Sequence, residues 1–226
     1  MSDGLTAARW DAEYRRGRYD AEPPLPFVAT ILAALAARPA LRAGEGLYVG
    51  CGNGRNFLPL ADAGLALWGL DVSGEALRQL ATRRPDRATR LRHGDFREQA
   101  PAGALAYLVA LQVFQHGRRA DARAYFERTR ALLAPGGLFF LRVNSAATEV
   151  YHRHAVVERD DLGGFTVEYA EGPKQGMAVH FYGRRELDAL TADGFRCVRE
   201  PYQDVTRRAP PQHGSWAQWE AIYERV

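Results

Sequence analysis

The sequence predicts an α/β fold in which a doubly wound, mostly parallel sheet carries helices on both faces. Short apolar segments alternate with helical patterns between residues 47 and 143. Two of these segments, "ALAYLVAL" and "LFFLRV", are apolar on both sides, as parallel strands are when helices cover both faces of their sheet. The stretch "LYVGCGNGRNF" passes from an apolar strand through glycines into a helical pattern, a geometry that suits a nucleotide-like ligand.

The first clear element is a helix over Leu25–Arg38, in which Phe27, Val28 and Ile31 share one apolar stripe. Pro39 and two glycines shortly after it end this helix. The alternation that follows predicts, in chain order, a strand Leu47–Val49, a helix through Ala61, a strand Ala66–Val72, a helix Glu75–Arg83, a strand Thr89–His93, a strand Leu105–Leu111, a helix Asp121–Leu133 and a strand Leu138–Val143.

From Ser145 to Gly183 this rhythm stops for roughly forty residues, which is too long for a plain connection. Within this stretch, "GFTVEYAEGPKQGMAVHFYG" alternates apolar and polar residues on both sides of a glycine- and proline-containing turn. We predict a β-hairpin that covers the ligand mouth as a lid, preceded by a helical or irregular arm over residues 147–161. A helix Arg185–Ala192 and strands Phe195–Val198 and Gln218–Tyr223 are expected to complete the fold.

The length of 226 residues indicates one domain with an addition. We divide it into a helical cap (1–43), a ligand-binding half (44–144), a lid and substrate insertion (145–183) and a C-terminal half of the sheet (184–226). No apolar run is long enough to span a bilayer, and the N-terminus lacks the apolar core of a signal peptide. The cysteines, Cys51 and Cys197, form no disulfide framework. We therefore expect a cytoplasmic protein with no membrane partner.

Three ligands compete for the glycine turn. A mononucleotide P-loop needs lysine and Ser/Thr where this chain has Arg55 and Asn56. A dinucleotide fingerprint needs a third glycine where Arg55 stands, which weakens an NAD or FAD site without excluding it. S-adenosylmethionine carries no phosphate and needs close main-chain approach, which glycines provide. Asp71, at the end of the next strand, could accept hydrogen bonds from two ribose hydroxyls, which fits NAD and S-adenosylmethionine equally, while Ser73 already serves as a helix cap.

Six segments resemble, in family order, motifs of the class I S-adenosylmethionine-dependent methyltransferases of the small-molecule type. They are "LYVGCGNGRN", "GLDVSGEAL", "HGDF", "LVALQVFQHG", "ARALLAPGGLFFL" and "HFYGRRELDALTADGF". The resemblance implies a Rossmann-like, seven-stranded sheet with an N-terminal helical cap and a hairpin lid inserted after the fifth strand. The chain departs from the common pattern at Tyr48, where the family usually carries an acidic residue.

The resemblance also implies a set of residues that bind S-adenosylmethionine and its product S-adenosylhomocysteine. Asp71 would take the ribose hydroxyls, Asp95 the adenine amine, and Tyr14, from the element "RWDAEYRRG", the methionyl carboxylate. Gln112 would lie near the sulfonium. The full set is Tyr14, Gly50, Cys51, Gly52, Gly54, Asn56, Asp71, Val72, Asp95, Phe96, Leu111 and Gln112.

His116, which follows the fourth strand, is the candidate general base for transfer to the methyl acceptor. Substrate-binding candidates are Tyr151, His154, His180 and Tyr182. No metal is expected. The chain has no asparagine/aspartate-proline-proline-aromatic element, and its basic run Arg83–Arg97 lacks interleaved aromatic residues, so we expect a small organic acceptor and no nucleic-acid partner. The accepting atom, oxygen, nitrogen or sulfur, stays open, as does a homodimer. The alternatives are an RNA methyltransferase, an NAD-linked reductase and a non-catalytic ligand-binding protein.

Overall fold

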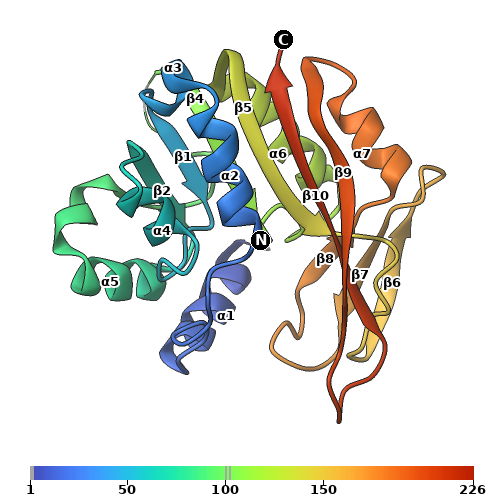
Figure 1. Ribbon diagram of the computed structural model, residues 1–226. Coiled ribbons are helices and arrows are strands. Elements are labelled where there is room, and N and C mark those ends of the chain that lie inside the picture. Colours follow the sequence, from blue (N-terminus) through green and yellow to red (C-terminus); the bar gives the residue numbers. More distant parts are fainter. Residues whose placement is uncertain (1–2, 100, 102) are drawn as a thin grey trace. The chain divides into compact units, whose positions relative to one another are not determined.

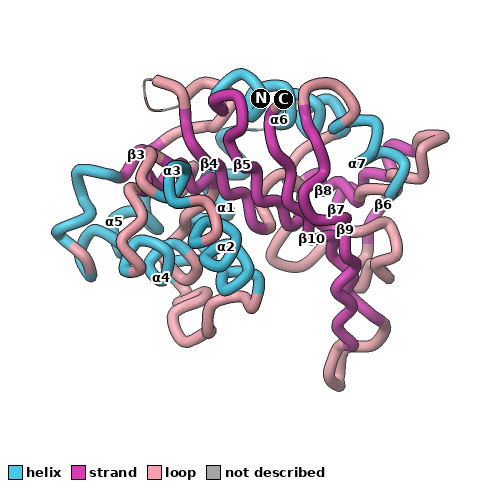
Figure 2. The backbone as a smooth tube through the Cα atoms, turned by 45° about the horizontal axis from the view of Figure 1, so that its top comes forward, coloured by secondary structure: helices cyan, strands magenta, loops and turns pink. Residues whose placement is uncertain are grey.

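A seven-stranded sheet runs through the molecule in the strand order β3-β2-β1-β4-β5-β10-β9. The computed structural model describes residues 3–99, 101 and 103–226. The strands are β1 (Gly46–Val49), β2 (Leu67–Asp71), β3 (Leu91–His93), β4 (Leu105–Leu111), β5 (Leu133–Asn144), β9 (Phe195–Arg207) and β10 (Ser215–Arg225). Figure 1 labels all of them except β3, which Figure 2 labels. Strand β2 pairs in parallel with β1 and β3, whereas β9 and β10 are antiparallel. The predicted seven-stranded, mostly parallel sheet is confirmed.

The chain divides into two compact units that share β4 and β5. Unit 1 comprises residues up to Val109 together with Leu132–Leu138, and unit 2 comprises Ala110–Ala131 together with Phe139–Val226. Unit 1 contains β1, β2 and β3, and unit 2 contains β9, β10 and a second, three-stranded sheet.

Unit 1 contains the helices of the N-terminal half of the chain. Its helices are α1 (Asp3–Arg15), α2 (Phe27–Ala36), α3 (Pro39–Arg42), α4 (Phe57–Asp62), α5 (Gly74–Arg83) and the 3₁₀ helix η1 (Pro85–Arg90). The predicted stripe of α2 is buried, and Ser73 caps α5 by accepting a hydrogen bond from Ala76 N at 3.1 Å. The predicted helices over Leu25–Arg38, through Ala61 and over Glu75–Arg83 are therefore confirmed as α2, α4 and α5, whereas α3 and η1 were not predicted.

Unit 2 contains α6 (Arg119–Leu132), α7 (Arg184–Thr191) and the three-stranded antiparallel sheet β6 (His154–Arg159), β7 (Phe165–Tyr169) and β8 (Ala178–Phe181). The predicted hairpin is confirmed as β7 and β8, with Val167 opposite Val179 in their shared core. The prediction of a helical or irregular arm over 147–161 is wrong in part, because β6 lies within it. Strand β6 escaped prediction because both of its valines are exposed, so no buried face produces an alternating pattern.

The three-stranded sheet is bonded by main-chain groups to the loop that follows β4. His180 N donates to Gln115 O at 2.8 Å, and Gly117 N donates to Ala178 O at 3.0 Å. Strand β8 is thereby anchored within unit 2 along its length. The expectation that the hairpin acts as a lid over the ligand mouth stays a prediction.

Strands β9 and β10 extend well beyond their predicted ends and form a long two-stranded ribbon (Figure 2). The register pairs Phe195 with Arg225 at one end and Arg207 with Ser215 at the other. The outer parts of both strands are polar and bond mainly to each other, so an apolar pattern reveals only their inner parts. Strand β5 also begins earlier than predicted, since it includes the Pro135-Gly136-Gly137 turn.

Among residues 3–99, 101 and 103–226, no helix combines the length and the apolar character needed to cross a lipid bilayer.

Gly46, the first residue of β1, has no room for a side chain, because a Cβ there would overlap the ring of buried Tyr107 on β4. We expect Gly46→Ala to lower the free energy of unfolding by roughly 1–3 kcal/mol, the usual effect of overpacking a core. Gly4, in α1, has open space around its Cβ position, so Gly4→Ala should change stability by less than about 0.5 kcal/mol. Chemical denaturation of both variants measures the difference, and equal stability of the two would contradict the expectation.

Candidate functional site

The turn after β1 is held open by three glycines with positive φ angles. Gly50, Gly52 and Gly54 have φ values of 69°, 55° and 101°, a region that residues with a side chain rarely adopt. Gly52 N donates a hydrogen bond to Asp71 Oδ2 at 2.7 Å, which ties the turn to the end of β2. The turn therefore has a defined shape and presents main-chain groups to a ligand.

Asp71 is held from two sides by the main chain. Besides Gly52 N on Oδ2, Ser73 N donates to Oδ1 at 2.8 Å. Each oxygen keeps a further lone pair, so the carboxylate can accept two more hydrogen bonds from a pair of neighbouring hydroxyls. Burial raises the pKa of Asp71 to about 6, although the hydrogen bonds from Ser73 and Gly52 oppose this shift.

Tyr14 covers the glycine turn. A Cβ at Gly52 would overlap the Tyr14 hydroxyl oxygen, so this hydroxyl lies directly on the main chain of the turn. Burial, with a smaller contribution from the negative charge of Asp71, raises the pKa of the phenol well above its usual value. Tyr14 is therefore a neutral hydrogen-bond donor, as its predicted contact with a carboxylate requires.

Helix α1 is attached to α5 by Asp11, a residue to which sequence analysis gave no role. Asp11 Oδ1 accepts from Ser73 Oγ at 2.6 Å and from Glu75 N at 3.1 Å, and Gln79 Nε2 donates to Tyr14 O at 3.0 Å. Asp11 thus acts as a second cap for α5 and fixes α1 at the level of Tyr14. The signal was present as the aspartate of "RWDAEYRRG", between Trp10 and Tyr14 in sequence.

Two other predicted cofactor residues, Cys51 and Asn56, belong to the turn and to the segment that follows it. Cys51 is buried against Gly69 of β2, and burial raises the pKa of its thiol well above the usual value, so it is neutral. Asn56 Oδ1 accepts from Leu25 N at 2.8 Å, and the Asn56 side chain also bonds to the buried hydroxyl of Tyr48. Tyr48 therefore supports the turn through Asn56, in place of the carboxylate that the resemblance leads one to expect.

The predicted adenine-binding residues follow β2 and β3. The Asp95 carboxylate accepts three hydrogen bonds from Arg97. They come from its main-chain N at 2.7 Å, its Nε at 2.9 Å and its Nη2 at 2.7 Å. Burial alone would raise the pKa of Asp95, but the bonds from Arg97 outweigh it and lower that pKa. Phe96 is buried, and Val72 O lies 3.1 Å from His93 Nε2. Asp95 is thus an ionised carboxylate that Arg97 holds in one orientation.

In unit 2, the end of β4 places Leu111 in the core and Gln112 at its boundary. Gln112 has a φ of 62°, one of two positive values for described residues other than glycine. Its main-chain N donates to Arg142 O at 2.7 Å, and its side-chain Nε2 donates to Gln218 Oε1 at 2.7 Å. Such a backbone conformation costs about 1–3 kcal/mol and concentrates at functional sites.

His116 lies on the loop after β4, as predicted, but it is a weak base. Burial and the positive charge of Lys174 lower the pKa of its imidazole to about 3, against a small opposing effect of a hydrogen bond with the Gln112 main chain. The ring is therefore neutral at physiological pH and has little tendency to take up a proton.

The four substrate-binding candidates fall into two groups. His180 and Tyr182 are buried and engaged: His180 bonds to Thr166 Oγ1 at 2.9 Å and to both Glu186 oxygens at 3.0 Å, and the Tyr182 hydroxyl donates to Phe114 O. Tyr151 and His154 lie outside the core, next to further aromatic and imidazole rings. The predicted place of all four in an acceptor pocket stays a prediction.

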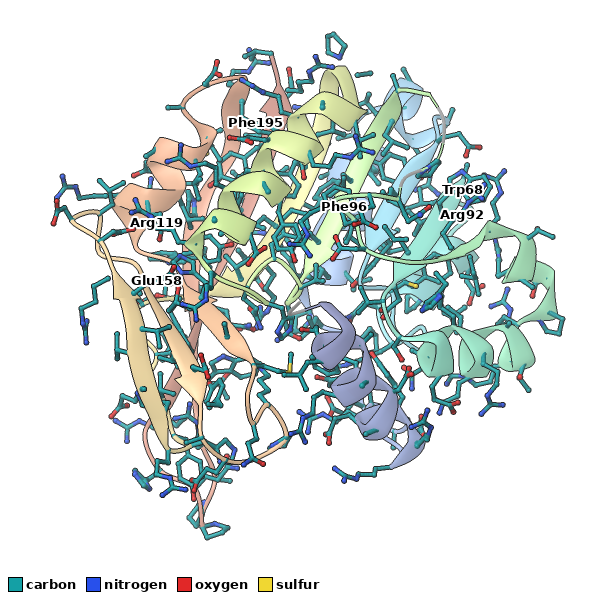
Figure 3. All side chains as sticks on the ribbon, turned by 180° about the vertical axis from the view of Figure 1, so that it is seen from behind. Trp68, Arg92, Phe96, Arg119, Glu158 and Phe195 are labelled. Carbon is teal, nitrogen blue, oxygen red and sulfur yellow. The ribbon has the colours of Figure 1, made fainter. Side chains whose placement is uncertain are left out.

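The basic run Arg83–Arg97 forms no free cationic stripe. Arg84 bonds to Asp62 at 2.6 Å and to Asp86 at 3.0 Å, and Arg90 bonds to Glu45 at 2.5 Å. On the outer strands β2 and β3, Arg92 lies 4.9 Å from the ring centroid of Trp68 (Figure 3). Most of these arginines are committed to carboxylates or to an aromatic ring, which leaves little charge for tracking phosphates.

Across the described residues, no three histidine, cysteine, aspartate or glutamate side chains are grouped as a metal site would require.

Residues 47–139, which contain the glycine turn and Asp71, match the family model described as a methyltransferase domain. Over these residues the chain carries a methyltransferase domain. This match confirms the recognition of a methyltransferase that was drawn from the sequence motifs, and solved structures of similar fold contain S-adenosylmethionine or S-adenosylhomocysteine. No protein of curated function matches the chain in sequence.

Solved structures share the fold of this methyltransferase domain across nearly the whole chain. A magnesium protoporphyrin IX methyltransferase from Synechocystis PCC 6803 is 15% identical with a TM-score of 0.65, over 100% of this chain and 98% of that chain. A 1,6-didemethyltoxoflavin-N1-methyltransferase from Burkholderia thailandensis is 18% identical with a TM-score of 0.63, over 100% and 91%. An amino pentose methyltransferase from Micromonospora echinaspora is 19% identical with a TM-score of 0.60, over 95% and 97%. At these identities the likeness confirms the Rossmann-like fold.

We expect the affinity for S-adenosylhomocysteine to be constant above pH 7 and to fall as the pH drops through about 6, where free Asp71 takes up a proton. The protonated carboxyl loses acceptor strength for the ribose hydroxyls. Calorimetric titration from pH 5 to pH 8 measures this, with Asp71→Asn expected to flatten the profile. Asp62→Asn, which removes an exposed carboxylate, should leave it unchanged. A wild-type profile that matches Asp71→Asn would contradict the assignment.

The raised pKa of Asp71 has the opposite effect on folding: it favours the folded protein as the pH falls, whereas donor binding weakens. Because folding raises the pKa of Asp71 above its ordinary 3.8, the charged form is less favourable in the folded protein than in the unfolded chain. This group therefore destabilises the fold above pH 6, and the penalty disappears as the pH falls below 3.8. If binding is lost near pH 6, unfolding caused by protonation of Asp71 is therefore not the reason.

Proposed function

We propose that the protein transfers the methyl group of S-adenosylmethionine to an oxygen, nitrogen or sulfur nucleophile of a small organic molecule and releases S-adenosylhomocysteine. The observation that carries this proposal is the Asp71 carboxylate, which the main chain of the glycine turn orients with a free lone pair on each oxygen. That arrangement suits the two ribose hydroxyls of an adenosyl donor.

Two observations support a small acceptor. The proteins of similar fold are named for magnesium protoporphyrin IX, 1,6-didemethyltoxoflavin and an amino pentose, none of which is a macromolecule. In this chain, the arginines that could follow an RNA backbone are largely paired with carboxylates. An RNA methyltransferase, the alternative within this enzyme class, would need those charges free.

Different residues of unit 1 bind different parts of the donor. The main chain of Gly50, Gly52 and Gly54 offers close approach to the methionyl part, Asp71 takes the ribose, and Asp95 takes the adenine amine. Tyr14, neutral and seated on the turn, donates to the methionyl carboxylate. Bound in this way, S-adenosylmethionine supplies an electrophilic methyl group, and the protein contributes orientation and exclusion of water. The insertion 145–183 supplies the acceptor side.

Calorimetric titration with S-adenosylhomocysteine tests the donor site, and we expect saturable binding. Asp71→Ala should weaken it by about 1–3 kcal/mol, because it removes hydrogen bonds to an ionised group. Asp62→Ala is the matched control and should bind as the wild type does. Transfer of label from methyl-labelled S-adenosylmethionine to a library of small molecules tests catalysis. Donor binding without transfer to any acceptor would favour the non-catalytic alternative, and no donor binding at all would sink the proposal.

A further inference from the structure

A buried arginine organises the polar groups of unit 2 at the end of its strands. Arg142, on β5, is 5% exposed, and its guanidinium donates to Glu220 on β10 and to Asp204 Oδ2 on β9 at 2.7 Å. Burial raises the pKa of the Glu220 carboxyl, and the arginine opposes this shift. A third donor, Arg142 Nε, reaches Gln218 Oε1 at 2.7 Å.

The arginine sets the direction of every hydrogen bond that follows. A guanidinium only donates, so the atom of Gln218 that faces it must be the carbonyl oxygen. The amino group of Gln218 then donates to Asn144 Oδ1 at 3.3 Å, which also accepts from Trp216 Nε1 at 3.0 Å. Indole N–H is likewise a donor only, so both ends of this chain of bonds agree on the orientation of the two amides.

Gln112 is the last member of this network. Its amino group donates to Gln218 Oε1 at 2.7 Å, the same oxygen that Arg142 occupies. Since that oxygen can only accept, the amide of Gln112 has one orientation, and its own carbonyl oxygen Oε1 is directed away from Gln218. The network therefore leaves Gln112 Oε1 to accept a hydrogen bond from outside it.

The backbone of Gln112 is anchored as firmly as its side chain. Its N–H donates to Arg142 O at 2.7 Å, and a hydrogen bond joins its main chain to the His116 ring. These bonds hold Gln112 at a φ of 62°, which an unanchored glutamine would seldom adopt. Main chain and side chain are thus both fixed at a position that immediately follows β4, at the edge where open α/β sheets bind their ligands.

We propose that Gln112 Oε1 accepts a hydrogen bond from the N–H of a neutral amine, that this amine is the methyl acceptor, and that Arg142 and Gln218 are positioning residues that hold Gln112 in this role. This inference rests on the proposed function and narrows its acceptor class. His116, which bonds to the Gln112 main chain, belongs to the same positioning set.

The chemistry of transfer explains why an amine suits this arrangement. The nitrogen lone pair forms the new N–CH₃ bond while the S–CH₃ bond breaks, and its electron pair stays on sulfur as the sulfonium becomes a neutral thioether. Positive charge appears on nitrogen, so its N–H becomes a stronger donor to Gln112 Oε1 as the reaction proceeds. The methylated ammonium then releases its proton to solvent. A neutral amine therefore needs no general base.

Oxygen and sulfur acceptors suit the same groups less well. A hydroxyl must lose its proton during transfer, and the imidazole of His116, with a pKa of about 3, has little capacity to remove it. A thiolate attacks without a proton and offers no donor to Gln112 Oε1, whose partial negative charge would repel it.

The first stage of the test separates this inference from the proposed function. Binding of S-adenosylhomocysteine is measured first, and its absence would remove the proposed function. A protein that binds is then assayed with methyl-labelled S-adenosylmethionine against libraries of primary and secondary amines, phenols and thiols of matched ring size. We expect labelled product from amines. Product from phenols or thiols alone, or from no compound although the donor binds, would overturn the amine assignment.

The second stage tests the positioning role with the best amine acceptor. Gln112→Met and Gln218→Met keep side-chain length and remove the polar contacts. We expect each to lower kcat/KM for the amine by about tenfold, the effect of one lost hydrogen bond to a developing charge. Gln218→Met, which changes no residue of the predicted donor-binding set, should leave the Kd for S-adenosylhomocysteine unchanged. The double variant should be no worse than Gln112→Met alone, because Gln218 acts through Gln112.

Two further variants make the outcome decisive. Gln218→Glu keeps oxygens that accept from Arg142 and Gln112, and it should restore most of the activity that Gln218→Met loses. Gln203→Met is the matched control, since Gln203 bonds to Ser145 Oγ at 2.7 Å outside the network, and its kinetics should match the wild type. Additive losses in the double variant, or equal losses in the control, would overturn the positioning role. If Gln218→Met does not fold, the comparison of Gln112→Met with Gln203→Met decides alone.

Discussion

The glycine turn of unit 1 depends on one buried carboxylate. Asp71 accepts a hydrogen bond from the turn after β1 and another from the start of α5, so a single side chain joins these two segments. The neighbouring Ser73 bonds in turn to Asp11 of α1. The glycine turn, β2, α5 and α1 are thus connected through three side chains within unit 1. Loss of the carboxylate would loosen the turn as well as remove an acceptor.

In unit 2, a buried cation takes the place of the buried carboxylate as the group that joins several segments. Arg142 is buried, and a buried guanidinium needs hydrogen-bond acceptors, so Glu220, Asp204 and Gln218 each accept from one of its three nitrogens. Because arginine and the indole of Trp216 can only donate, the amides between them have a single arrangement. A hydrogen-bond network that allows only one orientation of each amide fixes its side chains. A network whose groups can both donate and accept would let the amides flip at little cost in free energy.

Much of the architecture could be predicted from the sequence because it rests on local patterns. The apolar strands, the stripe of α2 and the Ser73 cap each leave a signature within a few residues. Strand β6 left none, since its valines are exposed and only its pairing with β7 defines it. Arg142 and Gln218 are 76 residues apart, and no local sequence pattern around either residue predicts their contact. Asp11 is similar, because its partner Ser73 lies 62 residues away.

The ionisable groups around the glycine turn share a further property, which bears on the choice of ligand. Burial is the largest influence on Tyr14, Tyr48, Cys51 and Asp71, and in every case it favours the neutral form. A mononucleotide P-loop places a lysine against the phosphates, whereas Arg55, the arginine within this turn, is paired with Glu22 at 2.9 Å. A cationic sulfonium donor has the reverse requirement: a desolvated surrounding with a single acidic group. Methyl transfer removes the positive charge from sulfur. Surroundings that solvate this charge weakly oppose its removal less than water does. The neutral side chains around this turn therefore suit the proposed donor, and they distinguish the turn from a P-loop that carries a lysine.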